Sequence, residues 1–104
     1  LSFWFNNIMM VLITYDVNTA SPSGARRLRQ VAKTCQDYGQ RVQNSVFECV
    51  IQNDQFVILK DKLESIMDKE NDSIRFYFIG KNWQRKVEMV GRQTSFDPEG
   101  TLIV

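Results

Sequence analysis

Asp16 is the acidic residue of this sequence that is best placed for chemistry. It directly follows the apolar run VLITY, and the turn-forming segment NTASPSG begins two residues later. A carboxylate at the end of a buried strand could help to hold a hard cation such as Mg²⁺, because such ions prefer oxygen ligands. The plainer interpretation is that Asp16 only accepts hydrogen bonds from backbone amides of the turn, and from this residue alone we favour that interpretation.

A single carboxylate is a poor magnesium site, and the sequence has no histidine to complete one. The lack of histidine also excludes serine–histidine and cysteine–histidine nucleophiles and histidine general bases. A two-fold axis near the end of the strand would bring Asp16 of two chains together, and the pair could then share a cation. We therefore expect dimerisation to complete the site.

Basic residues are concentrated in two parts of the chain, although the formal net charge is only +1. In residues 81–92, Trp83 lies among four cations, an arrangement that suits nucleic-acid binding or, as readily, the anchoring of a tail strand. In residues 24–44, three cations share the side of a predicted helix opposite its apolar stripe, where they could contact a phosphate backbone. A solvated helix surface is the plainer alternative, and charge alone favours it. The candidates for phosphate contact are Arg26, Arg27, Arg29, Lys33 and Arg41.

Composition bounds the class of protein. The 104 residues suffice for one domain, and 43% hydrophobic with 24% charged residues is typical of a soluble folded chain. Cys35 and Cys49 have neither the spacing of a zinc site nor that of a disulfide framework, which fits a reducing cytoplasm. No apolar run is long enough to cross a membrane, and the N-terminus lacks the pattern of a secretory signal. We expect a cytoplasmic protein with no membrane partner, in which residues 1–8 are an extension and residues 9–104 form a single domain.

Two helices are predicted from apolar side chains that recur at helical spacing. The first follows the NTASPSG turn and is ended by Gly39. The second is capped by Asp54 and ended by Asn71-Asp72. Their inward stripes are Leu28, Val31, Ala32, Cys35 and Tyr38 in the first helix and Phe56, Leu59, Leu63, Ile66 and Met67 in the second.

The remaining segments read as strands. Residues 9–17 are apolar up to the acid, as in a central strand that is buried on both faces. Residues 40–51 are rich in strand formers around a polar turn, which indicates two short strands, and residues 73–80 alternate in the manner of a fourth. The tail has room for one or two further strands.

The order β-α-β-β-α-β predicts an α+β, ferredoxin-like fold with an extra C-terminal strand and both helices on one face of the sheet. The other face then needs a cover, and Tyr15, Phe47 and Tyr77 are expected to project there. A second copy that packs sheet against sheet would bury them, so we expect a homodimer. The same order occurs in RNA-recognition motifs, but RFYF at residues 75–78 does not match their glycine-bearing aromatic signature.

Four blocks of this sequence together resemble the CRISPR-associated protein 2 family. The block YGQRVQNSVFE, residues 38–48, is specific, whereas Tyr15-Asp16-Val17 alone is not. The order and separation of the blocks make chance an unsatisfactory explanation, and the resemblance extends from residue 9 to residue 104. The other two blocks are Arg27-Leu28-Arg29 with Val31-Ala32, and Asp72-Ser73-Ile74-Arg75-Phe76-Tyr77.

The resemblance implies a homodimer with exchanged C-terminal strands that works in CRISPR spacer acquisition beside the integrase, CRISPR-associated protein 1. It implies an endonuclease, dependent on Mg²⁺ or Mn²⁺, that cuts RNA or double-stranded DNA, with Asp16 as its catalytic and metal-binding residue. Ser45 and Phe47 match family positions near the dimer interface, to which we also assign Tyr15 and Tyr77. The alternative is a non-catalytic adaptor that bridges integrase dimers and protospacer DNA.

Overall fold

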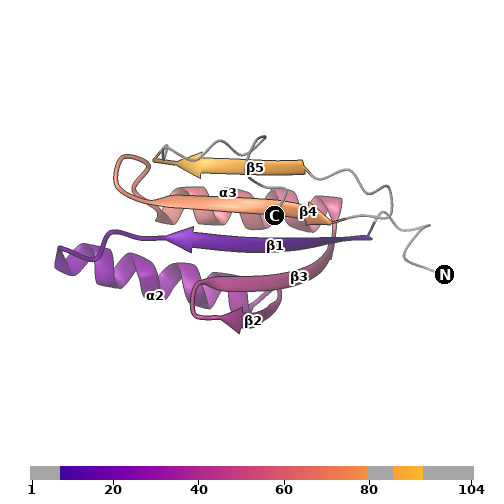
Figure 1. Cartoon of the computed structure of the whole chain (residues 1–104), viewed down its shortest axis with the longest axis horizontal. Coiled ribbons are helices and arrows are strands. Elements are labelled where there is room, and N and C mark those ends of the chain that lie inside the picture. Colours follow the sequence, from indigo (N-terminus) through magenta and orange to yellow (C-terminus); the bar gives the residue numbers. More distant parts are fainter. Residues whose placement is uncertain (1–7, 80–85, 93–104) are drawn as a thin grey trace.

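A computed structural model describes residues 8–79 and 86–92 (Figure 1). The order of its elements is the predicted β-α-β-β-α-β, followed by one more strand, which confirms the α+β, ferredoxin-like fold class. The elements are β1 (Ile8–Asp16), α2 (Pro22–Gln36), β2 (Gln40–Gln43), β3 (Val46–Gln52), α3 (Asn53–Ile66), β4 (Ser73–Ile79) and β5 (Lys86–Gly91).

The five strands form one sheet in the order β2-β3-β1-β4-β5, and each neighbouring pair is antiparallel. As predicted, β1 is the central strand. Both helices lie behind the strands in Figure 1, so they cover one face of the sheet. No helix among residues 8–79 and 86–92 covers the other face, which is called the uncovered face below. The register places Asp16 opposite Ser73, and Ser73 opposite Gly91, so the ends of β1, β4 and β5 meet at one edge.

The core lies between the sheet and the two helices. Alternate strand side chains enter it, because successive residues of a strand point to opposite faces. On α3, Phe56 contacts the rings of Phe76 and Phe78 edge-on, with centroids 5.2 and 5.0 Å away. The fully buried large hydrophobic side chains of the described residues are Val11, Ile13, Val31, Cys35, Phe47, Cys49, Leu59, Leu63, Ile74 and Phe76.

Helix α2 begins at the predicted turn, where Ser21 is the N-cap residue and its hydroxyl accepts a hydrogen bond from the Gly24 amide. The predicted bounds of α3 were wrong at both ends. Its N-cap residue is Gln52 rather than Asp54, and the Gln55 side chain accepts a bond from the Gln52 amide at 2.8 Å. The helix ends at Ile66, before Asn71-Asp72, because the next residue adopts an extended backbone.

The placement of Tyr15 and Phe47 on the uncovered face was wrong. Tyr15 is 6% exposed and Phe47 is fully buried, and their rings stack in the core beneath the helices with centroids 6.1 Å apart. On β1, Val11, Ile13 and Tyr15 are buried, whereas Thr14 and Asp16 point to the opposite face. A continuously apolar strand does not show which of its two faces meets the helices.

Two other residues assigned to an interface are placed differently. Tyr77 lies on the uncovered face, half-buried, opposite Leu12 of β1. Ser45 lies in the turn between β2 and β3, half-buried, and its carbonyl oxygen accepts a hydrogen bond from the Tyr15 amide at 3.1 Å. Their part in an interface stays a prediction.

The chain ends differ in part from the prediction. Strand β1 already begins at Ile8, the last residue of the expected extension, and residues 1–7 lie outside the described residues. Strand β5 pairs with β4 of its own chain, and the residues beyond 92, to which strand exchange was assigned, are also outside them. None of the helices in the described part of the chain has the length and apolar character needed to span a membrane.

Replacement of Phe47 by alanine tests its place in the core. We expect Phe47→Ala to lower the free energy of unfolding by about 3–5 kcal/mol, because it empties a fully buried site. Urea unfolding at one fixed protein concentration measures this, and Val57→Ala, at a side chain that is 59% exposed, should change it by less than about 0.5 kcal/mol. Weakened self-association of Phe47→Ala with unchanged unfolding would instead place this ring at an interface.

Candidate active site at the end of the central strand

Asp16 is the last residue of β1 and lies on the uncovered face of the sheet. Its side chain is 69% exposed, so the carboxylate is accessible to a ligand from solution. It borders an open depression of about 190 Å³ in which the ends of β1 and β4 meet. The residues that line this depression are Thr14, Tyr15, Asp16, Ser73 and Arg75.

The Asp16 carboxylate forms an ion pair with Arg92, whose Nη2 donates to Oδ2 at 2.8 Å. The amide of Arg92 in turn donates to the carbonyl oxygen of Asp72 at 2.7 Å. This approach requires glycine at position 91, where φ is +107° and a Cβ atom would collide with the same carbonyl group. The guanidinium group is therefore carried to Asp16 by a backbone that is closely fixed at the end of β5.

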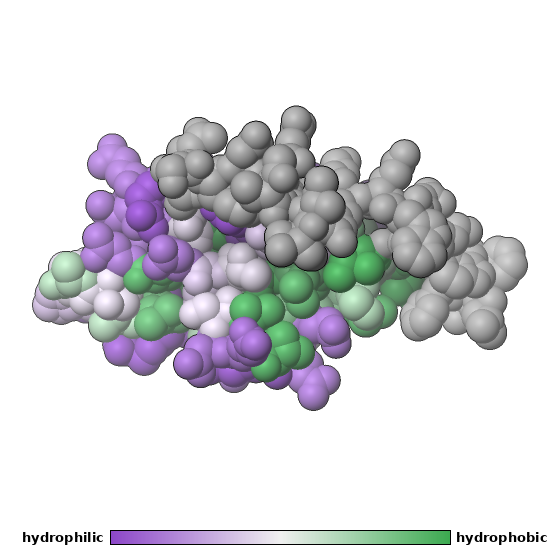
Figure 2. All heavy atoms as spheres, in the orientation of Figure 1, coloured by the Kyte–Doolittle hydropathy of each residue, from purple (hydrophilic) through white to green (hydrophobic). Residues whose placement is uncertain are grey.

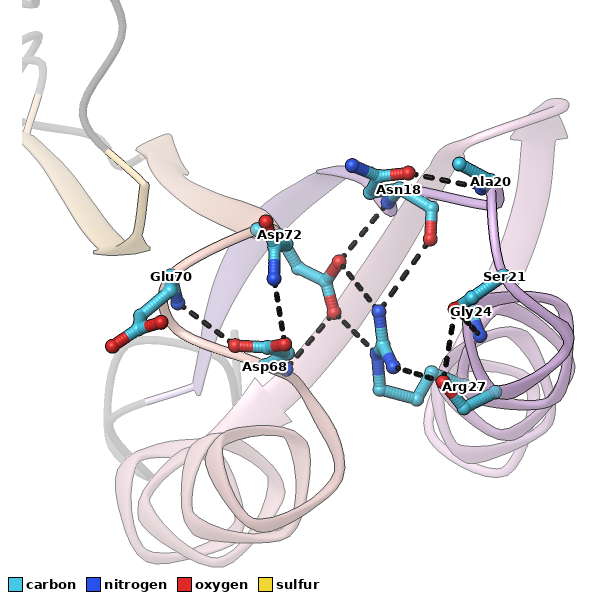
Figure 3. Close-up of polar contacts among 10 residues, drawn as sticks. Asn18, Ala20, Ser21, Gly24, Arg27, Asp68, Glu70 and Asp72 are labelled. Carbon is cyan, nitrogen blue, oxygen red and sulfur yellow. Dashed lines mark hydrogen bonds and ion pairs between the residues drawn. The ribbon is translucent and has the colours of Figure 1, made fainter.

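Asp72, just before β4, is the acid that ties the surrounding elements together (Figure 3). Its side chain is fully buried. Oδ1 accepts a hydrogen bond from the Asn18 amide after β1 at 3.0 Å, and Oδ2 accepts one from the Asp68 amide after α3 at 2.9 Å. Nε of Arg27, on α2, donates to Oδ2 at 2.8 Å. The turn-binding role considered for Asp16 thus belongs to Asp72.

The charges of this pair are stabilised at neutral pH. Burial alone raises the pKa of Asp72, but the hydrogen bonds from Arg27 and from the amides of Asp68 and Asn18 outweigh it and hold the pKa below its ordinary value. The same bond raises the pKa of Arg27. The ends of β1, α2, α3 and β4 are therefore joined by a charged group that is fully satisfied.

Arg27 was predicted to contact phosphate, and its contacts assign it a structural role instead. Besides Asp72, its guanidinium donates to the Ser23 hydroxyl at 3.2 Å and to the Asn18 carbonyl oxygen at 3.4 Å. Its side chain is only 16% exposed. The sequence could not distinguish it from its basic neighbours, because its acidic partner is 45 residues away in the chain.

The other basic candidates stay accessible. Arg26, Arg29 and Lys33 are exposed on α2, at spacings that place them on one side of the helix, away from the core. Arg41 is exposed on β2, at the opposite edge of the sheet from β5, and its guanidinium lies 5.1 Å from the centre of the Phe47 ring. The stretch that contains Trp83 lies outside the described residues.

A resident metal fits this site only in part. Within residues 8–79 and 86–92, no three His, Cys, Asp or Glu side chains are grouped so as to hold an ion. The exposed Asp16 carboxylate has the right chemistry for Mg²⁺, but one chain contributes only this one carboxylate, which is too few ligands to hold the ion. The thiols offer no alternative, since burial raises the pKa of Cys35 to about 12 and that of Cys49 to about 11 and keeps both protonated.

Sequence reasoning missed Asp72 and Arg92 as parts of this site. Asp72 was used to end a helix and as part of a family block but was given no role in the site, although an acid directly before a strand that alternates regularly is itself a signal of a structured turn. Arg92 was counted only within a basic stretch. Its partner is 76 residues away, a separation that no local pattern reveals.

The chain is similar to proteins of known family. A family model described as CRISPR associated protein Cas2 matches residues 9–87. A CRISPR-associated endoribonuclease Cas2 from Nitratidesulfovibrio vulgaris is 59% identical over 99 residues, which are 95% of this chain and 97% of the relative. A CRISPR-associated endonuclease Cas2 from Halalkalibacterium halodurans is 56% identical over 95 residues, 91% of this chain and 99% of that protein.

A solved structure gives the same answer. The crystal structure of Streptococcus pyogenes Cas2 at pH 6.5 aligns with a TM-score of 0.66 and 64% identity, and the alignment covers 73% of this chain and 92% of that one. These matches confirm the resemblance that the four sequence blocks indicated.

Replacement of Asp72 by asparagine tests the buried pair. We expect Asp72→Asn to lower the free energy of unfolding at pH 7 by about 3 kcal/mol, because Arg27 loses its counter-charge at a buried position. Because the folded pKa of Asp72 is lowered, its contribution is complete above its unfolded pKa of about 3.9 and is lost as the pH falls through the folded value. Urea unfolding from pH 7 to pH 2 should therefore show the two proteins converging at the acid end.

Asp61→Asn, at an exposed acid of α3, serves as the matched control and should change the unfolding free energy by less than about 0.5 kcal/mol. A constant gap between Asp72→Asn and the unsubstituted protein down to pH 2 would contradict a charged, stabilising Asp72.

Proposed function

Since the chain belongs to the CRISPR-associated protein Cas2 family, we propose that it is a metal-dependent endonuclease that cuts phosphodiester bonds of RNA or double-stranded DNA in the cytoplasm during spacer acquisition. The observation that carries this proposal is the exposed Asp16 carboxylate at the end of the central strand. The names of the relatives support nuclease chemistry, and the geometry supplies the acid through which it would act.

In a homodimer, the Asp16 carboxylates of the two chains could together form a cation site. Apolar side chains gather on the uncovered face of the sheet, and Figure 2 shows hydrophobic areas near the middle of this face with hydrophilic groups to the left and along the lower border. Val50 and Ile79 are about half exposed on this face, at 50% and 51%. A second copy that packs sheet against sheet would remove them from water. The apolar residues that the register places on this face include Ile8, Met10, Leu12, Val46, Val50, Tyr77, Ile79 and Met89.

Two Asp16 carboxylates brought together by a two-fold axis would hold Mg²⁺ or Mn²⁺. When bound, such an ion supplies the charge that polarises a phosphoryl oxygen and lowers the pKa of a water molecule. Asp16 itself would hold and orient the ion. Thr14 and Ser73, which both carry hydroxyl groups, line the same depression.

The nucleic acid would be bound through its phosphates by the exposed side of α2. Arg26, Arg29 and Lys33 present three positive charges there, and such contacts are independent of base sequence. Arg41 adds a charge at the β2 edge. The same surface favours the second candidate function, a non-catalytic adaptor that bridges dimers of the integrase, CRISPR-associated protein 1, and protospacer DNA.

Replacement of Asp16 by asparagine separates the two functions. We expect Asp16→Asn to lose at least about 100-fold in Mg²⁺-dependent cleavage of RNA and duplex DNA, because it removes both carboxylates of the dimeric site and a bound metal contributes several kcal/mol to such reactions. Asp61→Asn should cleave normally. Cleavage is measured with labelled substrates in Mg²⁺ and in EDTA.

Equal Mg²⁺-dependent cleavage by the unsubstituted protein and Asp16→Asn would contradict the proposed site. Loss of cleavage by Asp16→Asn, with nucleic-acid binding and spacer uptake in cells retained, would make the adaptor the principal function.

A further inference from the structure

The Asp16 carboxylate already has a cation, and that cation comes from the same chain. Nη2 of Arg92 lies 2.8 Å from Oδ2 of Asp16, a distance typical of a charge-assisted hydrogen bond. Both groups are accessible, at 42% and 69% exposed. A divalent ion that binds Asp16 must therefore meet the guanidinium of Arg92 at the same acid.

The pairing of the strands brings Arg92 close to Asp16. Asp16, Ser73 and Gly91 lie in one row across β1, β4 and β5, so the Arg92 side chain spans β4 to reach β1, about 10 Å or two strand spacings. Its backbone is held by the bond from its amide to the Asp72 carbonyl oxygen. Because Asp72 is itself held by its ion pair with Arg27, the backbone from which the Arg92 side chain extends is fixed in place.

We propose that Arg92 is a positioning residue for Asp16 that competes with the divalent cation, so that binding of the cation to the paired acids and release of the two Arg92 side chains are one event. The inference rests on the proposed function, which places two Asp16 carboxylates at one cation site. It concerns a residue outside the four sequence blocks that carried the family resemblance.

The competition between Arg92 and the divalent cation follows from the charges of the groups. Two carboxylates near a two-fold axis repel each other when no cation is bound, and one guanidinium for each acid cancels that repulsion. A divalent ion held by the Asp16 carboxylate would compete with the guanidinium hydrogen bond and repel the positive charge of Arg92. Arg92 thus allows the two Asp16 carboxylates to approach each other without a metal, and it lowers the affinity of the site for the metal that binds later.

The size of the effect follows from the exposure of the pair. An accessible ion pair changes an equilibrium by a factor of about 1.4 to 5, and the dimer contains two such pairs. Removal of the charge at position 92 should therefore raise the affinity for Mg²⁺ by about 2- to 25-fold.

Calorimetric titration of the full-length chain with MgCl₂, without nucleic acid, tests this. We expect Arg92→Gln to bind Mg²⁺ more tightly within that range and Arg92→Lys, which keeps the charge, to stay within about twofold of the unsubstituted protein. Lys69→Gln removes the same charge at an exposed residue of the turn before β4 and should not tighten binding. Far-UV circular dichroism establishes that each variant is folded.

Asp16→Asn is titrated beside these variants. If Asp16→Asn loses Mg²⁺ binding but Arg92→Gln binds no more tightly than Lys69→Gln, the competition is refuted and the proposed cation site stands. If Asp16→Asn binds Mg²⁺ as the unsubstituted protein does, the cation site itself is refuted, and the role of Arg92 with it.

Discussion

The buried carboxylate of Asp72 is the interaction on which the active end of this protein depends. Its carboxylate accepts hydrogen bonds from backbone amides that follow β1 and α3, and it forms an ion pair with Arg27 of α2. Its backbone carbonyl oxygen accepts a hydrogen bond from the amide of Arg92, which follows β5. Hydrogen bonds to a charged group in a dry interior are strong, so these elements share one fixed point. Asp16 and Arg92, which are both exposed, take their positions from it.

The second constraint is that each chain has one exposed acid at this point. In the proposed homodimer, symmetry would resolve this shortage, since an isologous interface doubles every group near its axis. The uncovered, largely apolar face of the sheet supplies a reason for two copies to meet.

Much of the fold could be predicted from the sequence, because its local patterns are strong. The alternation of Ile74, Phe76 and Phe78 predicted the strand β4 and the residues that share its inner face, and the NTASPSG turn predicted the start of α2. The facing of β1 could not be predicted, because both sides of that strand are apolar and the helices decide which side is buried. This is why Tyr15 and Phe47 were assigned to the wrong face.

The site was predictable only in its central residue. Asp16 stood out because an acid ends an apolar strand, whereas Arg27 and Arg92 are ordinary surface cations until distant parts of the chain bring them to Asp72 and Asp16. The charge pattern of the sequence shows that basic residues cluster. It does not show which of them form ion pairs within the fold. The close packing of Gly91 against the Asp72 carbonyl is equally invisible before the strands are paired.

The most direct measurement of the central claim, that two chains bring their Asp16 positions together, is cross-linking of Asp16→Cys with a short bifunctional thiol reagent. The native Cys35 and Cys49 are buried and protonated, so the introduced thiol is the reactive one among the described residues. The account predicts a covalent species of twice the 12.2 kDa chain, formed far more readily than with Asp61→Cys on α3. Equal, slow cross-linking of the two variants would contradict it.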